Sequence, residues 1–102
     1  MRKVINGKIY DDHTATWLCD AGNGYGIRDF RYVRAGLYVT KKGNFFLSGE
    51  GGPMSIFAVN DGDGTSGSEG IVPIDKAEAR RLCEIDDVDV ETMKKYFDIE
   101  EA

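Results

Sequence analysis

The chain has 102 residues, of which 41% are hydrophobic and 30% charged, a composition typical of a folded globular protein and not of a disordered one. No stretch approaches the roughly 18 consecutive apolar residues that a membrane span needs, and the N-terminal segment lacks the apolar core of a secretion signal. Cys19 and Cys83 are the only cysteines, and no CxxC spacing occurs. We therefore expect one cytoplasmic domain, residues 1–102, with two free thiols.

The net charge is −5, but the two parts of the sequence differ in sign. Residues 1–42 hold eight Lys or Arg and four Asp, whereas residues 43–102 hold five Lys or Arg and fourteen Asp or Glu. Such a chain can present one basic and one acidic face. The isoelectric point of about 4.8 argues against nucleic acid as the main partner, because nucleic-acid-binding domains are usually basic.

The first part of the chain has the pattern of short antiparallel strands. Asn6-Gly7 favours a type I′ turn and predicts a small hairpin around it. The β-forming residues of 14–19 predict a strand, and glycine-rich 21–26 predicts a loop. The strongest signal lies in 31–40, where apolar residues occupy every second position, as in a half-buried strand. These apolar residues are Val33, Ala35, Leu37 and Val39.

A hairpin is predicted to follow this strand. Lys42-Gly43-Asn44 turns the chain, and residues 45–48 return. A three-residue loop at this place pairs Val39 with Leu47, a register that keeps the apolar residues of both strands on one face. The segment Gly49–Pro53 is predicted to end the returning strand with glycines at positive φ.

The middle of the sequence is less regular. Residues 54–60 fit either a strand or a single helical turn. Residues 61–70 have the composition of a flexible surface loop. Residues 71–74 predict a short edge strand, because Pro73 cannot donate a hydrogen bond to a neighbouring strand.

The C-terminal segment, residues 75–102, predicts two short helices. Asp75 is a good N-cap, and Glu78 three residues later suggests a capping box. Asp89 is the expected N-cap of the second helix, and Val88 and Met93 have the spacing of a hydrophobic staple. The apolar faces are predicted to consist of Ala79, Leu82 and Cys83 in the first helix and Val90, Met93, Tyr96 and Phe97 in the second.

The predicted fold class is therefore α+β. A small antiparallel sheet of about four to six strands, built from hairpins in the β-rich residues 1–74, precedes the two helices of residues 75–102. Helices this short are marginal in isolation, so we expect both to pack on the sheet.

Few residues have the pattern of a catalytic centre, and we predict no catalytic residue and no cofactor. His13 is the only histidine and follows two aspartates, which could orient it as a general base, but no nucleophile is linked to it by motif. Cys19 and Cys83 lie in apolar contexts, whereas reactive cysteines need an electropositive and partly exposed one. Both are therefore predicted to be core residues.

Two glycine-containing segments each match only part of a known ligand-binding motif. Asp61-Gly62-Asp63-Gly64 begins like a calcium loop, but Ser66 and Val72 occupy the positions where an EF-hand has Gly and Glu. Gly49–Pro53 could offer backbone amides to a phosphate, but it lacks the Lys-Ser/Thr of a phosphate-binding loop. We predict no metal site. The glutamate that these glycines frame, Glu50, is a candidate contact residue.

Two charged groups remain as candidate surfaces. The basic and aromatic stretch with Arg28, Arg31 and Arg34 combines the charge and stacking that bind single strands. The acidic C-terminal stretch could dock on a basic, nucleic-acid-binding protein by imitating DNA phosphates. Its candidate residues are Glu84, Asp86, Asp87, Asp89 and Glu91.

Residues 37–55, LYVTKKGNFFLSGEGGPMS, resemble a pattern, LYxTKKGxxFLxGEGGxxS, of small proteins from bacterial phages, plasmids and conjugative elements. NGKIYD near the N-terminus and IVPIDKAEAR near the C-terminus are similar to the same group. The resemblance implies a mobile-element context and no catalytic residues. Small acidic proteins of such elements include inhibitors of host defence, anti-CRISPR and anti-restriction proteins among them.

The leading hypothesis is a non-enzymatic protein-binding module of mobile-element origin, acting through an acidic surface as an inhibitor of host defence. One alternative is a nucleic-acid-associated accessory protein that uses Arg28–Arg34. Another is a small enzyme or ligand-binding domain around Gly49–Pro53, with His13 or Cys19 recruited from elsewhere in the chain. The sequence leaves the oligomeric state open.

Overall fold

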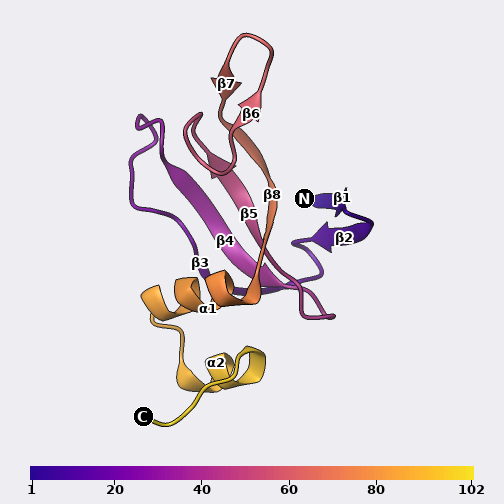
Figure 1. Ribbon diagram of the computed structural model, residues 1–102, viewed down its shortest axis with the longest axis vertical. Helices are drawn as coiled ribbons and strands as arrows, with labels where there is room; N and C mark the ends of the chain where they lie inside the picture. The colour runs from indigo at the N-terminus through magenta and orange to yellow at the C-terminus, as the bar shows by residue number, and fades with distance from the viewer.

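The computed structural model describes residues 1–102 and has an α+β fold (Figure 1). Its strands are β1 (Arg2–Ile5), β2 (Lys8–Asp11), β3 (Thr16–Asp20), β4 (Val33–Val39), β5 (Phe45–Gly51), β6 (Val59–Asn60), β7 (Thr65–Ser66) and β8 (Ser68–Ile74). The helices are α1 (Lys76–Ile85) and α2 (Val90–Tyr96). The predicted fold class is confirmed, since an antiparallel sheet precedes two C-terminal helices.

The central sheet has four antiparallel strands in the order β3-β4-β5-β8. The β1–β2 and β6–β7 hairpins are separate two-stranded units, and Figure 1 shows them at different places around the central sheet. β8 is an edge strand and contains Pro73, as predicted. It begins at Ser68, so the last three residues of the predicted loop 61–70 belong to a strand.

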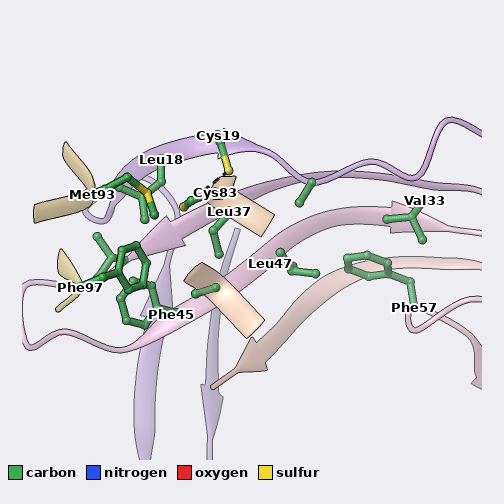
Figure 2. Packing of buried hydrophobic residues seen from close by; sticks show 13 residues of the cluster. Leu18, Cys19, Val33, Leu37, Phe45, Leu47, Phe57, Cys83, Met93 and Phe97 are labelled. Atoms are coloured by element: carbon green, nitrogen blue, oxygen red, sulfur yellow. Dashed lines mark hydrogen bonds between the residues drawn. The ribbon is translucent and has the colours of Figure 1, made fainter. Parts of the chain in front are cut away.

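One face of the central sheet carries the main core. Alternate residues of β4 and β5 point to this face, where Leu37 and Leu47 are cross-strand partners and are 0% and 4% exposed. Both helices cover it, and the aromatic rings of Phe45 and Phe97 stack at 5.3 Å (Figure 2). Phe57, in the turn after β5, packs into the same cluster. The helices therefore depend on the sheet, as their short length requires.

The opposite face is partly covered by the β1–β2 hairpin. Its cluster consists of Tyr10, Phe46 and Ile71. Phe46 is fully buried, with Tyr10 edge-on and Tyr38 stacked, each at a centroid distance of 5.4 Å. Aromatic pairs at this spacing add specific attraction to the burial of their area, so Phe46 fastens the first hairpin to the sheet.

The predicted register of the β4–β5 hairpin is wrong by two residues, because Val39 pairs with Phe45 and not with Leu47. The loop has the predicted length but lies one residue earlier. Thr40 and Asn44 close it through a backbone hydrogen bond of 2.9 Å, and Gly43 takes a φ of +86°. A type I turn followed by a left-handed residue places glycine at this position. The apolar face is unaffected, because the shift is an even number of residues.

Three other boundaries differ from the predictions. β4 begins at Val33 rather than at residue 31, because the Tyr32 amide turns back to the Asp29 carbonyl. β3 contains a bulge at Leu18 between its pairs with β4. Residues 54–60, left open between strand and helix, form a turn followed by the short strand β6.

Both helices begin at the predicted N-caps. The Asp75 carboxylate accepts a hydrogen bond from the Glu78 amide at 2.8 Å, and the Asp89 carboxylate accepts one from the Thr92 amide at 3.1 Å. The predicted capping box is wrong in its second half, because the Glu78 side chain pairs with Arg81. Neither helix has the length and apolar composition needed to cross a membrane.

Replacing Asp75 with alanine is expected to lower the free energy of unfolding by about 1 kcal/mol, because the first turn of α1 loses its side-chain acceptor. Urea denaturation monitored by circular dichroism measures this change. Asp63→Ala is a matched control, since the exposed Asp63 carboxylate accepts no hydrogen bond. Equal losses in both variants would contradict a capping role for Asp75.

Candidate functional site

Five predicted carboxylates gather where α1 ends and α2 begins, at the lower end of the molecule in Figure 1. We call this group the acidic corner. It consists of Glu84, Asp86, Asp87, Asp89 and Glu91, all of them exposed. The structure therefore brings together five of the six candidate partner-binding residues, because the chain reverses direction between the two helices.

The reversal between the helices is a Schellman motif. The Asp87 amide donates to the Glu84 carbonyl and the Val88 amide donates to the Cys83 carbonyl, at 3.2 and 3.0 Å. The motif requires a left-handed residue at its C′ position, usually Gly or sometimes Asn. Here that residue is Asp87, with a φ of +53°. An aspartate thus occupies a backbone position for which a residue without a Cβ is better suited.

The acidic corner also opposes the dipole of α1. The C-terminal end of a helix carries a partial negative charge and is stabilised by basic side chains. The last turn of α1 contains no basic residue, whereas Glu84, Asp86 and Asp87 all lie there or just beyond it. These carboxylates therefore add negative charge to a helix end that is already negative.

Two members of the acidic corner have structural contacts. The Asp86 carboxylate accepts a hydrogen bond from the Asp20 amide at 3.3 Å. Asp89 caps α2, and hydrogen bonds from the hydroxyl and amide of Thr92 lower the pKa of the Asp89 carboxyl below its usual value. The side chains of Glu84, Asp87 and Glu91 take part in no hydrogen bond or ion pair. Their charges are thus available to a partner.

A small, mainly apolar hollow adjoins the acidic corner. It has a volume of about 260 Å³ and is lined by Val88, Val90, Met93 and Ile99 together with two of the five carboxylates, Glu84 and Asp87. Val90 was predicted to belong to the buried face of α2, and this prediction is wrong: its side chain is 60% exposed. Val90 occupies the first helical position, beyond the edge of the sheet cluster that buries Met93 and Phe97.

Glu50 does not belong to the acidic corner. It lies on β5, where its cross-strand partners are Arg34 of β4 and Glu69 of β8. Because side chains alternate along a strand, this row lies on the face opposite the one that carries Leu37, Leu47 and the helices. The structure therefore separates Glu50 from the other five candidate residues by the thickness of the sheet.

The glycines around Glu50 have a reason other than the predicted one. None of Gly49, Gly51 and Gly52 has a positive φ, and the strand continues to Gly51 instead of breaking at Gly49. A Cβ on Gly49 would overlap the Arg34 carbonyl oxygen and come within 2.6 Å of the Ala35 Cα. A Cβ on Gly52 would overlap the Phe30 carbonyl. These positions exclude side chains because neighbouring backbones approach closely.

The same segment offers few free amides to a phosphate. β5 is hydrogen-bonded to strands on both of its sides, and the Gly52 amide donates to the Tyr32 carbonyl at 3.0 Å. The Met54 amide donates to the Phe30 carbonyl at 2.8 Å. Backbone groups that are already paired cannot cradle an anion, so the geometry does not favour a ligand site at Gly49–Pro53.

The three arginines of the predicted basic strand do not share one strand. Arg28 and Arg31 precede β4, and only Arg34 lies in it. Arg31 forms an ion pair with Asp29 at 2.9 Å and lies over the Tyr25 ring at 4.1 Å. That pairing lowers the pKa of Asp29 to about 2 and raises the pKa of Arg31. Much of the Arg31 charge is therefore compensated within the loop.

Other basic residues gather where no prediction placed a site. Lys8, Lys41 and Lys42 line a groove of about 460 Å³ between the first hairpin and the β4–β5 turn. The Lys8 ammonium donates to the Asn44 side-chain oxygen at 3.4 Å. The groove also contains the carboxylate-bearing Asp11. Six of the eight basic residues of positions 1–42 are thus divided between two places, the Arg28–Arg34 segment and this groove.

His13 lies in an exposed turn beside carboxylates. Its Nδ1 is 3.1 Å from Asp12 Oδ1 and 3.5 Å from Asp11 Oδ1, and its side chain is 81% exposed. Burial raises the pKa of Asp12, but hydrogen bonds from the N-terminal ammonium and Ser48 outweigh it and lower that pKa overall. Asp11, Asp12 and His13 are close enough together to ligate a cation, although Asp12 already has two partners.

The calcium-like segment is the turn of the β6–β7 hairpin. The Asp61 carboxylate accepts hydrogen bonds from the Ser66 hydroxyl and from the Asp63 amide. These bonds lower the pKa of Asp61. Asp61 thus organises the turn, which accounts for an aspartate at this position without a cation.

Sequence reasoning missed the apolar residues of the acidic corner and the special backbone of Asp87. A usable signal was present for Asp87: residues 86–88 directly follow the helical apolar stripe, where a glycine is the common terminator. No signal indicated that Val90 and Ile99 line one hollow, because that depends on how the chain after α2 folds back.

Comparison of the chain with family models, curated proteins and solved structures found no match in any of the three. The resemblance of residues 37–55 to mobile-element proteins therefore stays a prediction.

Proposed function

We propose that the chain is a non-enzymatic protein-binding module and that the acidic corner is its docking surface. The observation that carries this proposal is Asp87. It places a carboxylate at a helix end that favours positive charge, in a left-handed backbone position where glycine is the more common residue. A residue that opposes local stability without compensation inside the fold is typical of a functional surface.

The partner is expected to be basic and to insert an apolar side chain. The carboxylates of the acidic corner would attract Lys or Arg and increase the association rate. The hollow lined by Val88, Val90, Met93 and Ile99 would bury an aliphatic group of the partner. Because Glu84 and Asp87 line this hollow beside its apolar residues, a partner can make an apolar and a charged contact at the same place.

The mobile-element resemblance supports a more specific form of the proposal. In that form the module inhibits a host defence protein by occupying a basic surface that otherwise contacts nucleic acid. The cross-strand row of Arg34, Glu50 and Glu69 forms a second charged surface on the opposite face of the sheet. A partner bound at the acidic corner contacts Glu50 only if it extends around the edge of the sheet. Arg28, Arg31 and Arg34 offer a weaker basis for nucleic-acid association, because they are dispersed and Arg31 is paired.

A pair of charge-matched variants tests the proposal in lysate from a bacterial host. The corner variant combines Glu84→Gln, Asp87→Asn and Glu91→Gln, which removes three unpaired carboxylates and keeps Asp86 and Asp89 in their structural contacts. The control variant combines Asp29→Asn, Asp63→Asn and Glu78→Gln, which has the same net charge and changes carboxylates away from the hollow. We expect the wild type and the control to retain the same basic proteins, released by salt, and the corner variant to lose them.

The free energy of unfolding of the single variant Asp87→Asn gives an independent readout. Asp87→Asn suits the left-handed backbone and removes a charge from the negative helix end, so we expect the free energy of unfolding to rise by about 0.3–1 kcal/mol. A substitution that stabilises the fold but weakens binding of the partner identifies a residue kept for function rather than for stability. Equal retention by the corner and control variants would exclude the acidic corner as the docking surface.

A further inference from the structure

The two cysteines meet in the core between β3 and α1. The Cys19 and Cys83 sulfur atoms are 3.9 Å apart, although 64 positions separate the residues in the sequence. Figure 2 shows the Cys19 side chain extending from its strand toward Cys83 on the helix. Each side chain is 1% exposed. The sequence predicts two free thiols and gives no sign that they are neighbours, yet the fold brings them together.

Burial protects this pair of thiols. It raises the pKa of the Cys19 thiol to about 12, with Cys83 as the next cause, and it also raises the pKa of the Cys83 thiol. The thiolate is the reactive form of cysteine. Both residues are therefore inert while α1 covers them, and their reaction requires α1 to separate from β3 or the chain to be in the course of folding.

We propose that Cys19 and Cys83 form a reversible intramolecular disulfide that fastens α1 to β3 under oxidising conditions. The sulfur atoms lie 3.9 Å apart across the interface, so they must approach by about 1.9 Å to reach the S–S bond length of a disulfide. The bond would close a long loop, and cross-links of long loops restrict the unfolded chain most strongly. One hydrogen bond, from the Asp20 amide to the carboxylate of Asp86 at the end of α1, already connects β3 to this helix end.

A disulfide compound such as oxidised glutathione supplies the oxidising equivalents. One thiolate attacks the glutathione disulfide, forms a mixed disulfide and releases one glutathione thiolate. The second cysteine thiolate then attacks the protein sulfur of that mixed disulfide, forms the Cys19–Cys83 bond and releases the second glutathione. The protein loses two electrons and two protons, and the oxidant is reduced to two glutathione molecules.

The test measures the thiol–disulfide equilibrium of the 102-residue chain in a buffer of reduced and oxidised glutathione. Reduced and oxidised samples are brought to equilibrium from both directions, once under native conditions and once in 8 M urea, and free thiols are then tagged with a maleimide and weighed by mass spectrometry. A bond that fits the native fold must be favoured by folding, because the two equilibria are linked. We expect the constant for the internal disulfide to be at least about tenfold larger under native conditions.

Single variants identify the bonded pair. Cys19→Ala and Cys83→Ala each leave one thiol, and we expect each to form only the glutathione adduct. Alanine is used because a serine hydroxyl would be buried without a partner. A constant that is equal or smaller under native conditions would overturn the proposal, as would a wild-type product consisting of glutathione adducts or covalent dimers.

Discussion

Replacing Phe46 with alanine is expected to lower the free energy of unfolding by about 3–5 kcal/mol. The Phe46 ring is fully buried, and it contacts Tyr10 on one side and Tyr38 on the other. Its removal leaves a cavity between the sheet and the β1–β2 hairpin that rigid neighbours fill only in part. Because the hairpin is a separate two-stranded unit, we also expect its amides to exchange faster with solvent.

Phe30→Ala is the matched control, since it makes the same chemical change on a ring that is 65% exposed. It is expected to change the unfolding free energy by less than about 0.5 kcal/mol. Urea denaturation of both variants, together with hydrogen exchange of residues 2–11, checks the prediction. If Phe46→Ala cost no more than Phe30→Ala, the hairpin would not be held by this aromatic cluster.

Replacing Gly49 with alanine is expected to cost more than about 3 kcal/mol, at the upper end of what overpacking produces. The added Cβ would overlap the Arg34 carbonyl oxygen and lie 2.8 Å from the Ala35 Cβ. Neither β4 nor β5 can move away easily, because each is hydrogen-bonded on both sides in the central sheet. The strain must then separate the two strands that form the middle of the fold.

Gly70 provides a control on the neighbouring strand. It is the cross-strand partner of Gly49, and a Cβ there would meet no atom within 4 Å. Gly70→Ala is therefore expected to be neutral or to stabilise the fold by up to about 1 kcal/mol, because it restricts the unfolded chain. Thermal unfolding of the two variants measures the contrast. Similar behaviour of both would show that close backbone approach is not why Gly49 is a glycine.

The fold was predictable wherever one local signal determined it. Asp75 and Asp89 cap their helices because a short acceptor side chain suits that position in almost any context. The alternation in β4 identified Leu37 and Val39 as core residues, since a half-buried strand has a period of two.

The β4–β5 register and the reason for the glycines near Glu50 were not predictable. Two registers two residues apart bury the same apolar face, so the burial pattern could not distinguish them. A glycine gives the same sequence signal whether it is needed for a positive φ or for space. Only the position of the Arg34 and Phe30 carbonyls reveals that Gly49 and Gly52 are needed for space.

The candidate site was predictable in its charges but not in its shape. The sequence indicated Glu84, Asp86, Asp87, Asp89 and Glu91 because charge runs are visible along the chain. It did not indicate that Glu50 lies on the far face of the sheet, because that depends on the strand order. Nor did it indicate the contact between Cys19 and Cys83, which pairs a strand near one end of the chain with a helix near the other.

The most direct test of the docking proposal maps the bound partner onto the molecule. Backbone amide shifts of the isotope-labelled chain are followed by NMR while the basic protein retained in the lysate experiment is added, at low and at high salt. The docking proposal predicts shift changes at residues 84–93 and at Ile99 that diminish with salt. Changes confined to Arg28–Arg34 or to Gly49–Pro53, with the acidic corner unaffected, would contradict it.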